Sequence, residues 1–124
     1  MPGYPGGGYA KLLRTNQQVF LFNNETVAVG GASIAVQLER ISHSSYPWGT
    51  SFQVKFAANP GAFEVDIQIA DTDADSDYIS VAQIAAANAT FVGRYDMTNL
   101  FPRFVRARVV SLTNAVGVTV LVTR

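Results

Sequence analysis

The 124-residue sequence contains no cysteine, a single histidine and no excess of charge of either sign. Without cysteine, a disulfide framework, a thiolate zinc site and a cysteine nucleophile are excluded. One histidine, His43, excludes metal sites that need several imidazole ligands. Nine basic and nine acidic residues balance to zero, so the chain lacks the global positive field that gathers nucleic acid. No apolar run approaches the roughly 18 residues that cross a bilayer, so no membrane contact is expected.

The sequence also offers little to a catalytic mechanism. His43 lies in a polar loop with serines, without the Gly-x-Ser-x-Gly turn that exposes a nucleophile. The glycines at 6–8 are not followed by the Lys-Ser/Thr pair of a phosphate-binding loop. Glu64 and Asp66 could be taken for the carboxylate pair of a glycoside hydrolase. They alternate with apolar residues, however, and are expected to be outward-facing strand residues. We therefore predict that the protein is not an enzyme and needs no organic cofactor.

What the sequence does contain is period-two alternation of apolar and polar residues from Val19 onward. It predicts strands at 34–38, 52–56, 63–69, 105–109 and 116–122, with shorter ones at 18–23, 26–29, 78–83 and 91–95. The alanine-rich stretch 81–88 is the one place that favours a helical turn. Short strands at roughly ten-residue spacing predict an all-β fold, a two-sheet antiparallel β-sandwich or jelly roll, in a single domain over 17–124.

Turn signals suggest how some of these strands connect. Asn59-Pro60-Gly61 separates 52–56 from 63–69, which we expect to pair as a hairpin or as neighbouring strands. Thr113-Asn114 joins the last two predicted strands. The valine-rich segment 116–123 needs a cover, either within the sandwich or from a neighbouring subunit.

Residues 1–16 begin with a glycine- and proline-rich stretch and are expected to form a flexible, extended N-terminal arm. Tyr4, Pro5 and Tyr9 are candidate contacts with a neighbouring subunit, because rigid aromatic side chains add contact area at low entropy cost. A frayed terminus is the alternative.

Charge is unevenly placed along the chain. Residues 60–96 hold seven acids against one arginine, a balance of −6, whereas 97–124 hold four arginines and no acid, a balance of +4. Opposite patches suit binding to a lattice or to copies of the same chain, or else acidic and basic strands that are neighbours within one monomer. Arg103, Arg106 and Arg108 are therefore candidate partner-binding residues, with ion pairs to the acidic segment as the alternative. Their stripe is too short to favour nucleic acid.

The densest signal is an acidic loop between two predicted strands. Carboxylates occur there at every second residue, at Asp71, Asp73, Asp75 and Asp77. Such oxygens suit calcium, and the first three match the opening spacing of an EF-hand loop. The match fails further on, where Ser76 replaces glycine and Ala82 replaces glutamate. Calcium is thus one interpretation of the loop, and a solvated acidic turn is the other.

Two aromatic residues, Tyr46 and Trp48, lie in another loop around Pro47. Aromatic side chains on the loops of a β-sandwich can stack on sugar rings, so these two are candidate ligand-binding residues. An apolar plug at the end of the sandwich is the alternative.

The segments AFEVDIQIADTDADSDYISVAQI and RFVRARVVSLTNAVGVTVLVTR, within residues 50–124, resemble the small β-sandwich virion proteins of tailed bacteriophages. Discoidin-like and carbohydrate-binding jelly rolls share the layout. The resemblance implies a non-enzymatic capsid decoration or cement protein, made in the host cytoplasm and located on the virion exterior. It implies a homo-oligomer bound to the major capsid protein, and a trimer would fit a three-fold axis. The alternative is a carbohydrate-binding or tail-accessory β-sandwich module that binds host-surface glycans.

Overall fold

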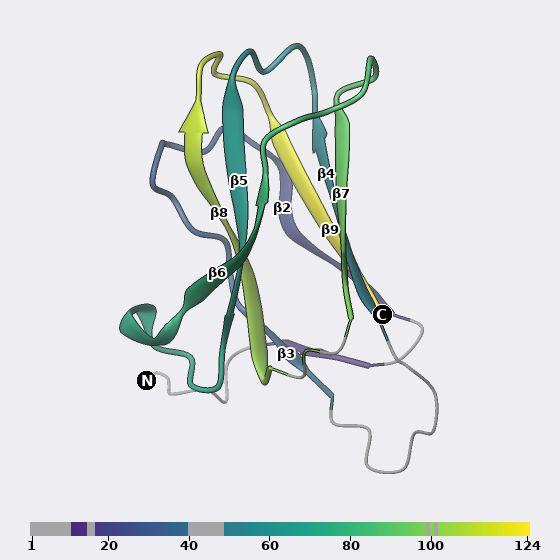
Figure 1. Cartoon of the computed structure of the whole chain (residues 1–124), viewed down its shortest axis with the longest axis vertical. Helices are drawn as coiled ribbons and strands as arrows, with labels where there is room; N and C mark the ends of the chain where they lie inside the picture. The colour runs from purple at the N-terminus through teal and green to yellow at the C-terminus, as the bar shows by residue number, and fades with distance from the viewer. Residues whose placement is uncertain (1–10, 15–16, 40–48, 99, 101) are drawn as a thin grey trace.

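The chain is folded into two β-sheets that pack face to face (Figure 1). This computed structural model describes residues 11–14, 17–39, 49–98, 100 and 102–124. In spatial order, the first sheet contains β1 (Lys11–Leu13), β3 (Val36–Leu38), β8 (Phe104–Leu112), β5 (Phe63–Ala70) and β6 (Ile79–Ile84). The second contains β2 (Gln18–Glu25), β9 (Val118–Thr123), β4 (Thr50–Phe56) and β7 (Val92–Met97). The predicted all-β, two-sheet sandwich is confirmed; neighbouring strands are antiparallel except β1 and β3, which are parallel.

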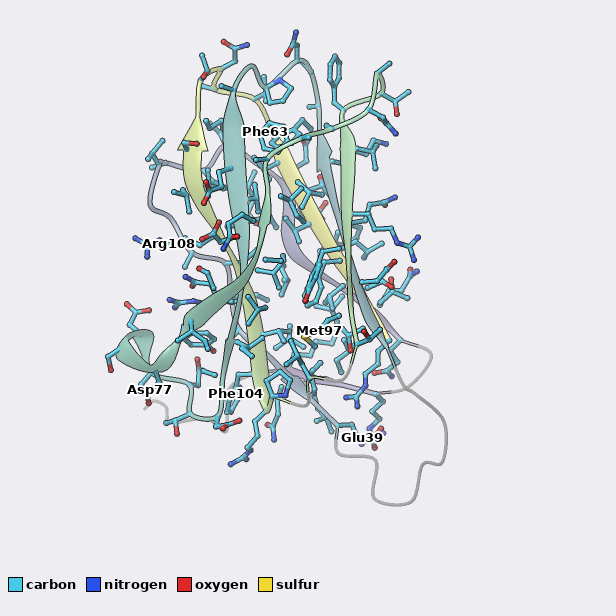
Figure 2. All side chains as sticks on the ribbon, in the orientation of Figure 1. Glu39, Phe63, Asp77, Met97, Phe104 and Arg108 are labelled. Atoms are coloured by element: carbon cyan, nitrogen blue, oxygen red, sulfur yellow. The ribbon has the colours of Figure 1, made fainter. Side chains whose placement is uncertain are left out.

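The core lies between the sheets and is made by alternate residues of the strands. In β9 the inward residues Val118, Val120 and Val122 are fully buried. Figure 2 shows Phe63 and Met97 in the space between the two sheets. Burying one such side chain stabilises the fold by about 1.5–3 kcal/mol, so the two inner faces supply the main driving force for folding.

The connections differ from the expected hairpins. Strands 52–56 and 63–69, expected to be neighbours, are β4 and β5 and lie in opposite sheets, as do β8 and β9. Among the described strands, β5 and β6 are the one consecutive pair that stays in one sheet. Alternation identifies the apolar face of a strand but not its neighbours, and the loop 57–62 is long enough to cross the ~10 Å between packed sheets.

The valine-rich strand β9 is covered within the monomer. It lies between β2 and β4, with Val122 opposite Phe52 and Val120 opposite Val54. Both of its edges are therefore hydrogen-bonded, and it leaves no aggregation-prone edge for a neighbouring subunit to cover.

Three shorter predictions are wrong. Residues 26–29 form no strand, because the chain turns at Val29 and Gly30, where Gly30 has a φ of +90°. Residues 81–84 belong to β6, so the helical turn expected at 81–88 is absent. Residues 11–13 of the predicted arm instead form β1, because pairing with β3 buries Leu13 completely. Tyr4, Pro5, Tyr9, Tyr46 and Trp48 lie outside the described residues.

Candidate functional site

The predicted acidic and basic segments meet on the outer face of the five-stranded sheet. β5 and β8 are adjacent there, and the loop between β5 and β6, with its 3-10 turn η2 (Asp75–Asp77), lies at the end of the sheet (Figure 1). Gln68 lies opposite Arg106 in the register, and Asp66 lies opposite Arg108. Phe104, Arg106 and Arg108 thus share one strand face, as alternation predicted.

Arg106 is the centre of this face. Its Nε donates to Gln68 Oε1 at 2.8 Å and its Nη1 donates to Asp75 Oδ1 at 2.5 Å. The guanidinium carbon lies 3.9 Å from the centroid of the Tyr78 ring, a cation–π contact. Only 8% of Arg106 is exposed. Arg106 thus forms an ion pair within the chain, which is the alternative that the sequence left open for it.

Tyr78 gives the acidic loop a small apolar base of its own. It is buried with Ala70 and Phe104 in a cluster separate from the main core. Its hydroxyl donates to Asp73 Oδ1 at 2.7 Å. Burial, together with this bond to a carboxylate, raises the pKa of Tyr78 well above its usual value. The loop is thus held to the sheet by two side chains, Arg106 and Tyr78.

The four loop aspartates do not converge. Asp75 bonds Arg106, which lowers the pKa of the Asp75 carboxyl, while Asp73 accepts from Tyr78. Asp71 and Asp77 line a shallow hollow of about 300 Å³. Within the described ranges, no three acidic or histidine side chains are grouped so as to hold a metal ion. Calcium binding at this loop stays a prediction.

Asp66 differs from the solvated outward residue that alternation suggested. It is 7% exposed, because its strand is flanked by β8 on one side and β6 on the other. Ser80 Oγ donates to Asp66 Oδ2 at 2.7 Å, and Oδ1 is buried without a protein partner among the described residues. Side-chain contact with Asp66 raises the pKa of the neighbouring Glu64, because a second carboxylate alongside disfavours the ionised form.

Two of the three predicted arginines stay exposed. Arg103 lies with its guanidinium carbon 5.6 Å from the Phe104 ring centroid, and Arg108 Nε donates to the backbone oxygen of Gly30 at 3.2 Å. Figure 2 shows Arg108 on the outside of β8, directed away from the core. These two cations and the protruding Asp75, whose side chain is 92% exposed, give the face charges of both signs.

Sequence reasoning missed three members of this network, Gln68, Tyr78 and Ser80. Gln68 carried a signal, since it alternates with buried residues of β5 and therefore faces outward with Arg106. The positions of Tyr78 and Ser80 depend on how the loop returns to β6, where a bulge shifts the register after Ile67.

Comparison with protein-family models, curated proteins and solved structures finds no match. The described part of the chain has no helix long and apolar enough to span a membrane.

Proposed function

We propose that the protein is a non-enzymatic virion protein of the capsid decoration type, which binds the major coat protein on the exterior of a phage head. The observation that carries the proposal is the outer face of the five-stranded sheet, where the braced acidic loop carries Asp75, β8 carries the exposed Arg108, and Arg103 lies exposed next to Phe104. The sequence resemblance to small β-sandwich virion proteins of tailed phages adds support.

Two physical properties suit this face to lattice binding. Charges of both signs on one surface favour a specific orientation on a partner that carries the complementary arrangement. The loop is braced by Arg106 and Tyr78 before any partner arrives, which reduces the ordering cost of association. A trimer would place three such faces around a three-fold axis of the coat lattice.

The first test is the copy number of the protein in purified virions, measured by quantitative mass spectrometry against the major coat protein. The proposal expects a number comparable to that of the coat. Absence from particles would overturn it, and a handful of copies would favour a tail accessory instead.

The face is tested by binding of the purified protein to particles that lack it. The double variant Arg103→Glu, Arg108→Glu is expected to lose most of its occupancy, because two attractive charges become repulsive. Lys55→Gln is the control, since Lys55 is exposed on β4 in the other sheet. Equal occupancy for the double variant and the wild type would move the binding face elsewhere.

A further inference from the structure

The outer face of the four-stranded sheet carries a second, independent feature. Register places Phe20 opposite Leu121, Leu121 opposite Gln53, and Gln53 opposite Arg94, in a row across all four strands. Directly paired residues lie on the same face of a sheet, so this row faces outward together. In the next row Lys55 pairs with Thr119.

Phe20 faces outward because it alternates with the buried residues Val19 and Leu21. The register with β9 shifts between Phe20 and Phe22, and the consecutive residues Leu21 and Phe22 are both buried, at 3% and 4% exposure. Strict alternation would have put Phe22 outside with Phe20, so this bulge is what turns Phe22 into the core. Phe20 is 47% exposed, and no other aromatic side chain that the structure describes is as open to solvent.

Beside Phe20 is a groove of about 410 Å³. Its polar lining comes from three strands and consists of Asn23, Asn24, Gln53, Lys55 and Thr119. Four of these five side chains are neutral groups that hydrogen-bond, and Lys55 supplies the one charge.

Lys55 is available to a ligand in a way that Arg94 is not. Arg94 Nε donates to Asp96 Oδ1 at 2.8 Å, and its Nη2 donates to Ser51 Oγ at 3.3 Å. Within the part of the chain that the structure describes, Lys55 has no carboxylate within salt-bridge distance. A ligand in the groove therefore meets one positive charge that forms no ion pair with the described residues.

The end of the groove is fixed by the backbone. Asn24 has a φ of +51°, and its N–H donates to Thr119 Oγ1 at 3.0 Å. The close approach of Gly117 permits this arrangement, because a Cβ added there would lie 2.0 Å from Asn24 Oδ1. The polar groups around Asn24 are thus positioned before a ligand binds.

We propose that this groove binds an acidic glycan, with one sugar ring stacked on Phe20 and the carboxylate of a uronic acid paired with Lys55. An aromatic ring beside a few fixed polar groups matches a sugar, which has one apolar face and a rim of hydroxyls. The unneutralised lysine selects the acidic sugar by charge complementarity. The groove lies on the four-stranded sheet, whereas the proposed coat-binding face belongs to the five-stranded sheet. Glycan binding can therefore be tested independently of attachment to the virion.

The test is isothermal titration of the full chain with a hexamer of galacturonic acid, compared with the neutral hexasaccharide maltohexaose. We expect the acidic hexamer to bind and the neutral one to bind at least about tenfold more weakly, which corresponds to about 1.4 kcal/mol. Phe20→Ala and Lys55→Gln should each weaken binding of the acidic hexamer by at least about tenfold. Arg103→Gln, which removes an exposed charge from the other sheet, should leave the affinity unchanged.

Thermal unfolding of each variant shows whether a loss of binding comes from a loss of folding. Lys55 is exposed, so Lys55→Gln should retain the wild-type melting temperature even if Phe20→Ala does not. No binding of the acidic hexamer at millimolar concentration overturns the proposal. So does binding that neither groove variant weakens, and equal affinity for the two hexamers overturns the assignment of an acidic sugar.

Discussion

Replacing either partner of the Arg106–Asp75 ion pair should have very different effects on stability. The Arg106 side chain is 10% exposed, whereas that of Asp75 is 92% exposed. Arg106→Ala removes the charged hydrogen bond to Gln68, the contact with Tyr78 and the packing of a long side chain. Part of this loss is offset because the buried cation no longer has to be desolvated. We expect Arg106→Ala to lower the free energy of unfolding by about 2–3 kcal/mol.

Asp75→Asn should cost much less. Water screens an exposed carboxylate and solvates the group that replaces it, so the expected loss is about 0.5–1 kcal/mol. In thermal unfolding followed by circular dichroism, a chain of this size loses roughly 4 °C per kcal/mol. The two variants should therefore melt about 8–12 °C and about 2–4 °C below the wild type.

The double variant separates the ion pair from the rest of the network. If Arg106 acts mainly through Gln68 and Tyr78, the coupling energy between positions 106 and 75 should stay below about 1 kcal/mol. Equal losses for the two single variants would refute this reasoning, because they would make the exposed ion pair the dominant interaction of Arg106. A loss near zero for Arg106→Ala would show that the loop is held by other contacts.

Two further changes test the loop packing and the carboxylate pair. Gly61 has a φ of +68°, and a Cβ there would lie 2.9 Å from Thr113 Cβ, so Gly61→Ala should cost about 2 kcal/mol in urea unfolding. Gly49→Ala is its control, because the nearest atom of the described residues to a Cβ at Gly49 is 3.7 Å away, and equal losses would contradict the strain argument. The contact with Asp66 raises the pKa of Glu64 in the folded state, so the folded chain binds the carboxyl proton of Glu64 more tightly than the unfolded chain does. Ionisation of Glu64 therefore lowers the stability of the fold. Glu64→Gln should therefore raise the melting temperature at pH 7 and lose that gain below about pH 4, and a gain that persists at acidic pH would contradict repulsion between the two carboxylates as its cause.

Much of the fold could be predicted from alternation alone. The strands 52–56, 63–69 and 105–109 lie where the pattern put them, and Val105, Ala107 and Val109 are fully buried as the period requires. Their pairing could not be predicted in the same way. Each strand of a sandwich shows one apolar face whichever sheet it joins, so the pattern of β4 and β5 is equally compatible with a hairpin and with a crossing between sheets.

The candidate site was accessible to prediction only in part. Opposite charge on 60–96 and 97–124 indicated that the two segments could meet, and Arg106 and Asp75 do. Which arginine becomes internal depends on where the loop returns to the sheet, a tertiary contact with no local sequence signal. Phe20 shows the same limit: the run Val-Phe-Leu-Phe is apolar throughout, so which of its two rings is exposed follows from the pairing with β9.

The two outer faces of the sandwich differ in how completely their polar groups are used. On the five-stranded sheet, Arg106, Gln68 and Tyr78 each have a partner within the chain, and the exposed charges stand on a braced surface. On the four-stranded sheet, Lys55 and Phe20 face solvent without such partners among the described residues. A braced surface suits contact with another large, rigid body, whereas an open groove suits a small ligand that supplies the missing partners. Variants of Arg103 and Lys55 should therefore separate attachment from glycan binding, each affecting one activity and leaving the other intact.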